Sequence, residues 1–130
     1  MGTPDTWYAY FHVRGSFDPD DVTRRMGVTP TKIAREGETI GSANTGRPCS
    51  LWALHSRLKQ TAPLERHVQD VLDQLDENKV AFEQLSRELD GTLQLVGYFA
   101  EREPGVHFER EIVERIARYA LSIDCDFYNC

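Results

Sequence analysis

The fold is decided by the stretch Phe17-Asp-Pro-Asp-Asp-Val-Thr-Arg-Arg-Met-Gly-Val-Thr-Pro-Thr31, which directly follows a strand-like run. This stretch predicts a short helix with well-defined ends. Asp18 can cap its start, Pro19 suits its first turn, and Gly27 suits the left-handed residue beyond its last turn. Pro30 then prevents the helix from restarting. The chain therefore passes from a strand into a helix here, and the stretch contains no recognisable catalytic motif.

The preceding run, Trp7 to Arg14, alternates between apolar and polar side chains, as a half-buried strand does. Downstream, apolar residues recur at helical spacing after Pro63, and this long helix is expected to kink or split at Asp76-Glu-Asn78. The expected strands are 7–14, 32–35, 51–57, 92–100 and 121–127, with a further short strand considered at 106–108. The expected helices are 19–26, 63–89 and one with its buried stripe over 112–120.

Strands joined both by turns and by amphipathic helices are typical of a mixed, mainly antiparallel sheet covered on one face by helices. We therefore predict an α+β two-layer sandwich with the order β-α-β-β-α-β-(β)-α-β. The 130 residues predict a single domain over 1–130, large enough to bury around two-thirds of its unfolded surface without disulfides or metals.

Several residues together resemble a known family. They are Phe17, Pro19, Val22-Thr23, Gly27 and Pro30-Thr31, followed by Gly37, Trp52 and the closing Leu121-Ser-Ile-Asp-Cys-Asp-Phe-Tyr128. In this pattern the chain is similar, over nearly its whole length, to the bacterial family called domain of unknown function 4279. Met26 and Asp76-Glu-Asn78 depart from the pattern without changing the fold that it implies. That family has no established activity, so the resemblance implies a shared fold and no catalytic residue.

The composition narrows the class of protein. A formal net charge of −6 and a pI near 5.2 repel phosphate backbones, so nucleic acid is not expected as a partner. The three cysteines, Cys49, Cys125 and Cys130, are an odd number at wide spacing, which suits a reducing compartment. The sequence contains no targeting segment or apolar run of membrane length. We expect a cytoplasmic protein with no membrane partner, no cofactor and no metal.

The polar side of the predicted sheet is the most informative surface. If strands 7–14, 92–100 and 121–127 are neighbours, their alternation places one set of side chains opposite the apolar face. Tyrosine and arginine are favoured where a side chain must bury area and keep a hydrogen bond. This face is therefore a candidate for binding a partner protein or a second copy, and a solvated face whose aromatics only stabilise strand pairing is the alternative. The candidate residues are Tyr8, Tyr10, His12, Arg14, Tyr98, Asp124, Asp126 and Tyr128, with Gln94 and Val96 between them.

The same face offers a weaker candidate for chemistry. Asp124 and Asp126 share one side of a strand, and with His12 they would suit a metal or an acid–base pair. No spaced set of histidines or cysteines completes a coordination sphere. A salt link between Arg14 and one of the aspartates is the preferred interpretation.

A basic, glycine-containing segment is the candidate for a small anion. Lys32, Arg35 and Arg47 would suit an anionic ligand or an acidic partner segment, whereas a solvated loop is the alternative. The run from Gly41 to Arg47 resembles a phosphate loop, but Pro48 and a strand follow where that loop needs Lys, then Ser or Thr, and a helix.

The other histidines, cysteines and tryptophans are interpreted structurally. His55 is expected to pack in the core or at its rim, and His67 and His107 are expected to be exposed. Cys125 falls on the predicted core face of the last strand. Trp52 is expected to cover the sheet edge or to support the loop before it.

These observations assign no activity and no catalytic residue. The preferred hypothesis is a small non-catalytic protein-interaction module of bacterial type, acting as a homodimer, a partner-binding protein or an immunity-like accessory protein. The alternative is a small anion- or ligand-binding domain, or an enzymatic one, that uses the basic loop 32–47.

Overall fold

The computed structural model describes residues 4–39, 41, 46–100 and 104–130. Its five strands form one sheet in the order β2-β3-β1-β4-β5, with β1 in the centre. The strands are β1 (Thr6–Gly15), β2 (Lys32–Ala34), β3 (Ser50–His55), β4 (Thr92–Phe99) and β5 (Ser122–Asn129). The helices are α1 (Pro19–Met26), α2 (Leu64–Leu75), α3 (Lys79–Leu89) and α4 (Arg110–Arg118), with the 3-10 helix η1 (Asp76–Asn78) between α2 and α3.

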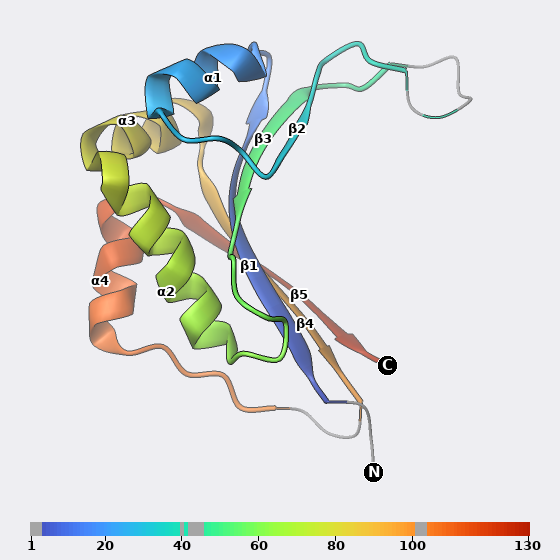
Figure 1. Ribbon diagram of the computed structural model, residues 1–130, viewed down its shortest axis with the longest axis vertical. Helices are drawn as coiled ribbons and strands as arrows, with labels where there is room; N and C mark the ends of the chain where they lie inside the picture. The colour runs from blue at the N-terminus through green and yellow to red at the C-terminus, as the bar shows by residue number, and fades with distance from the viewer. Residues whose placement is uncertain (1–3, 40, 42–45, 101–103) are drawn as a thin grey trace.

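All of these helices lie on one side of the sheet, and its other side carries none of them (Figure 1). β1 pairs antiparallel with β3 and β4, and β3 pairs antiparallel with β2. β4 and β5 are parallel, and α4 lies in the crossover that a parallel pair requires. The predicted α+β fold, with a mixed, mainly antiparallel sheet, is confirmed. Among the described residues, no helix is long and apolar enough to cross a bilayer.

The ends of α1 are formed by the residues that predict them. The Oδ1 atom of Asp18 accepts a hydrogen bond of 2.9 Å from the backbone N–H of Asp20, which satisfies one donor at the helix start. Gly27 follows the last turn at φ 68°, and its N–H donates to the Thr23 carbonyl at 2.9 Å. The helix from 19 to 26 is therefore confirmed together with its caps.

The core lies between the helices and the sheet, and an aromatic cluster joins the two layers. Trp52 from β3, Phe11 from β1 and Phe82 from α3 are all fully buried. Their ring centroids lie between 5.6 and 6.2 Å apart. The indole Nε1 of Trp52 also donates to Thr23 Oγ1 at 3.0 Å, which ties β3 to α1. Trp52 is structural, as predicted, but it lies inside the core and does not cover the sheet edge.

α4 is anchored at η1, where the long helical segment breaks between α2 and α3. The chain forms η1 at the predicted positions, 76–78. There Asp76 Oδ2 accepts a hydrogen bond of 2.8 Å from Arg115 Nη2, and Asp76 Oδ1 accepts one from the hydroxyl of the buried Tyr119. Both donors come from the end of α4 or directly after it, so the break provides the anchor for that helix.

Three expectations about burial and local structure are wrong. Residues 106–108 form no strand. Cys125 is exposed, because β5 is the edge strand of the sheet and α4 packs against α2 instead of covering β5. His67 is fully buried on the sheet-facing side of α2, where its Nδ1 lies 2.7 Å from Ser56 Oγ. His107 is exposed, as expected.

Gly97 is required by the packing of Trp7. The two residues are paired across β1 and β4, and a Cβ on Gly97 would overlap the Trp7 ring. We expect Gly97→Ala to lower the free energy of unfolding by about 1–3 kcal/mol, the usual cost of overpacking. Gly105→Ala is the control, because a Cβ there meets open space. Equal stability of the two variants in urea denaturation would contradict this packing.

Candidate functional site

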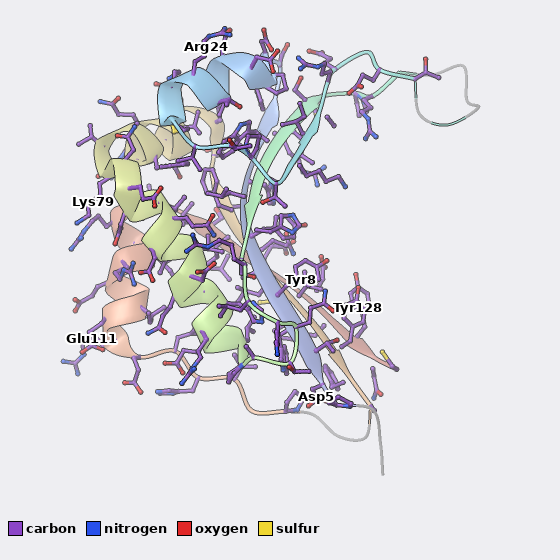
Figure 2. The ribbon with its side chains drawn as sticks, in the orientation of Figure 1. Asp5, Tyr8, Arg24, Lys79, Glu111 and Tyr128 are labelled. Carbon is purple, nitrogen blue, oxygen red and sulfur yellow. The ribbon has the colours of Figure 1, made fainter. Side chains whose placement is uncertain are left out.

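The register of the strands gathers the predicted partner-binding residues on the side of the sheet away from the helices, called here the open face. Tyr10 of β1 is paired with Gln94 of β4, and Gln94 is paired with Asp124 of β5. Likewise, Tyr8 is paired with Val96 of β4, and Val96 is paired with Asp126 of β5. Figure 2 shows the tyrosines at positions 8 and 128 on this side of the sheet. All eight predicted residues therefore share one face.

The centre of the open face is a cluster of stacked rings. The Tyr10 and His55 rings are directly paired across β1 and β3, with centroids 4.5 Å apart and planes 12° apart. Tyr8 stacks on both of them, at 6.0 Å from Tyr10 and 5.8 Å from His55. Such contacts add about 0.5–1.5 kcal/mol per pair beyond area burial. The rings therefore form a rigid, ordered surface with polar groups at their edges.

A second aromatic pair lies over β4 and β5. Tyr98 and Tyr128 stack with centroids 5.1 Å apart. They remain 39% and 47% exposed, so this pair is the most accessible apolar part of the face. Beside it, Gln94 Nε2 donates to Asp126 Oδ2 at 2.9 Å.

The strand order prevents the expected salt link between Arg14 and an aspartate. β4 lies between β1 and β5, and the register places Arg14 beside Leu51, toward the opposite end of β1 from Tyr8. Among the residues that the structure describes, Arg14 has no ion-pair partner. The expectation of an Arg14–Asp124 or Arg14–Asp126 link is therefore wrong.

Burial keeps the ionisable rings of the face neutral near pH 7. Burial lowers the pKa of both His12 and His55. The neighbouring cation Arg14 lowers the pKa of His12 further, and Lys32 does the same for His55. Burial also raises the pKa of Tyr8 and Tyr10. The charges are thus confined to the two ends of the face.

Arg14 and Lys32, called here the basic end of the open face, lie beside a small hollow. Arg14 and Lys32 line a cavity of about 120 Å³ together with the stacked rings. The remaining lining residues are Tyr8, Tyr10, Leu51, Ala53 and His55. The acidic end, Asp124 and Asp126, lies across the sheet on β5. Within the described part of the chain, no group of three His, Cys, Asp or Glu side chains is placed to hold a metal.

The structure separates the three residues predicted to gather an anion. Lys32 lies on the open face, near Arg14. Arg35 lies beside α1 and donates to Asp18 at 3.2 Å and Asp20 at 3.0 Å. Arg47 pairs through its backbone with Gly37 and Glu38, on the segment that leads out of β2. Residues 40 and 42–45 of the predicted anion loop lie outside the described residues.

Two residues of the open face were missing from the predicted set. His55 stacks on Tyr10, and Lys32 lines the hollow. The signal was present in the alternation Leu51, Ala53, His55, which shares a face with Tyr10 once β3 is paired with β1.

Comparison with known proteins places the whole chain in one family. No curated protein and no solved structure matches it. A family model described as "Domain of unknown function (DUF4279)" matches residues 5–130. This match confirms the resemblance carried by the residues around α1, and the chain belongs to the DUF4279 family.

Proposed function

We propose that this protein is a non-catalytic interaction module of bacterial type that binds a protein partner, or a second copy, through its open face. The observation that carries the proposal is the ordered aromatic surface on the side of the sheet that no described helix covers. A cytoplasmic setting is part of the proposal, since Cys49, Cys125 and Cys130 are free thiols. Under this proposal the protein is a partner-binding or immunity-like accessory protein.

The side chains of the face favour a protein partner. Tyrosine buries a large area with few rotatable bonds and keeps its hydroxyl available for a hydrogen bond. Because the rings are already stacked, little conformational entropy remains to be lost on binding. The half-exposed Tyr98 and Tyr128 supply apolar area, and the charges at both ends supply specificity.

Small-anion binding is the second candidate, and the hollow near β2 favours it. Arg14 and Lys32 line that hollow. Arg35 is engaged by two carboxylates of the α1 region, so the proposed anion site moves from the loop 32–47 to the open face. Titration with inorganic phosphate, followed by NMR, is expected to shift the Lys32 and Arg14 signals first if this candidate is correct.

The interaction proposal is tested with a matched pair of surfaces. Tyr10→Ser combined with Tyr98→Ser disrupts the open face, whereas Val80→Ser alters α3 in the helix layer, where Val80 is 69% exposed. We expect the double variant to lose association, with itself or with a partner from native lysate, and Val80→Ser to keep it. Light scattering coupled to gel filtration and affinity capture provide the two readouts. Association that survives the double variant in a folded protein would contradict the proposal.

A further inference from the structure

We propose that the occupant of the open face is a second copy of this chain, related by a two-fold axis at Tyr10 that places the basic end of each copy over the acidic end of the other. This inference rests on the proposed function and names its partner.

The register makes the two ends symmetric about Tyr10. Lys32 pairs with Ala53, and Ala53 pairs with His12. Lys32 therefore lies two strands away from β1, in the row of His12, which is two residues after Tyr10. Asp126 pairs with Val96, and Val96 pairs with Tyr8. Asp126 therefore lies two strands away on the opposite side of β1, in the row of Tyr8, which is two residues before Tyr10. A two-fold axis that passes over Tyr10 in the plane between two stacked sheets, and runs perpendicular to the line from Lys32 to Asp126, therefore brings Lys32 of one copy over Asp126 of the other.

The second charge pair is brought together by the same axis. Asp124 lies beside Gln94 in the register row of Tyr10, and Arg14 lies at the far end of β1. Arg14 lies about 13 Å from Tyr10 along β1 and Asp124 about 10 Å from it across the strands. With Lys32 over Asp126, Arg14 therefore comes near Asp124 of the other copy, within reach of the long arginine side chain. The uncharged rings of Tyr8, Tyr10 and His55 then occupy the centre of the contact, where desolvation of a charge would be most costly.

Charge balance favours a second copy over a partner of one sign. Among the residues that the structure places, the open face carries two cations and two carboxylates, at opposite ends. A basic partner would be repelled by Arg14 and Lys32, and an acidic partner would be repelled by Asp124 and Asp126. Only a surface with both signs in the reversed arrangement satisfies all four charges, and a second copy presents that arrangement by symmetry.

The size of the face predicts a weak, salt-sensitive dimer. The five strands are 10, 3, 6, 8 and 8 residues long. At about 4.8 Å between strands and about 3.3 Å per residue, they give roughly 550 Å² per copy. Two copies therefore bury roughly 1,100 Å², just below the range of stable specific interfaces and in the range of weak, transient ones. Its peripheral ion pairs would be screened at high ionic strength.

Pairing of two β5 edges is the competing mode of dimerisation. Ile123 and Phe127 are exposed on this strand, and an antiparallel pair that aligns Ile123 with Phe127 would bury both. The same register would place Asp124 of one copy opposite Asp126 of the other, and like charges directly opposite destabilise a strand pair. The edge mode therefore meets a repulsion that the face mode avoids.

Charge reversal tests the inference. The oligomeric state is measured by light scattering from about 10 to about 500 µM, a range that spans micromolar Kd values. We expect the native chain to dimerise with concentration, and Lys32→Glu or Asp126→Lys alone to raise Kd about tenfold or more. An equimolar mixture of these two variants is expected to restore the dimer, because both charge pairs become opposite again. Lys79→Glu, an equal charge change on α3, is expected to leave Kd unchanged.

Three results would overturn the inference. One is a native chain that stays monomeric throughout this range. Another is a dimer that survives both single reversals but is lost in Phe127→Ser, which would indicate edge pairing. The third is a mixture of the two reversed variants that stays monomeric. If the chain is monomeric while the Tyr10 and Tyr98 variant still loses a partner from lysate, the proposed function stands and only the second copy is rejected.

Discussion

Replacing Phe82 by alanine is expected to lower the free energy of unfolding by about 3–5 kcal/mol, the range for deleting a buried aromatic ring. Phe82 is 0% exposed. Its ring meets Phe11 at 5.6 Å in an edge-on contact and Trp52 at 6.0 Å. Removing it leaves a cavity where α3 packs on the centre of the sheet, and the two remaining rings are held by their own strands and cannot collapse fully into it.

Val80→Ala is the matched control for this variant. Val80 lies on the same helix, two residues away, and is 69% exposed. Its truncation is expected to change stability by less than about 0.5 kcal/mol. Urea denaturation, followed by tryptophan fluorescence, measures both variants. A loss below about 1 kcal/mol for Phe82→Ala would show that the cluster of Phe11, Trp52 and Phe82 does not hold the two layers together.

The fold was predictable because its local signals agree with one another. The alternation in β1 predicted which side chains share a face, and Asp18 and Gly27 predicted both ends of α1. These signals depend on neighbours in sequence, which a single chain reveals. The open face follows from them as soon as β1, β4 and β5 are adjacent.

The errors concern which element covers which. Cys125 alternates with other apolar residues as a core residue would, but the pattern cannot show that α4 packs on α2 and leaves β5 uncovered. The Arg14–aspartate link failed for a similar reason, since strand order places β4 between the two. Periodicity identifies the face of a strand, whereas its burial depends on tertiary packing.

The burial of His67 was indicated by its position on α2, but its residue type led to the wrong prediction that it is exposed. It lies three residues after Leu64 and four before Val71, which is the spacing of the buried stripe of α2. A histidine is usually interpreted as polar and exposed, and its half-buried partner Ser56 was not identifiable from the sequence. The helical position was therefore more informative than the identity of the side chain.

Below about pH 6.5, the ordinary pKa of histidine, the free energy of unfolding is expected to fall as the pH is lowered. His67 is 0% exposed, and burial lowers its pKa in the folded chain. Its Nδ1 lies 2.7 Å from Ser56 Oγ, and its Nε2 has no partner of hydrogen-bonding geometry among the described residues. The unfolded chain therefore takes up a proton that the folded chain resists.

The sign and size of this effect follow from the proton balance. Stability is fully present above the unfolded pKa and decreases as the pH falls toward the folded pKa, by at most about 1.4 kcal/mol per pH unit for each such histidine. His12 and His55 act in the same direction, because burial lowers their pKa values too. Asp70 has a lowered pKa, so its contribution is lost only at more acidic pH, outside the window from pH 5 to 7.

His67→Gln separates the buried histidine from the others. Urea denaturation between pH 5 and 7 is expected to show a shallower pH dependence in this variant than in the native chain. His107→Gln is the control, because it removes an imidazole that is exposed. An NMR titration of the His67 ring in the native chain checks the same point without a mutation. A ring that titrates at or above its ordinary pKa, or an unchanged slope in His67→Gln, would show that burial of His67 is not what makes this fold sensitive to acid.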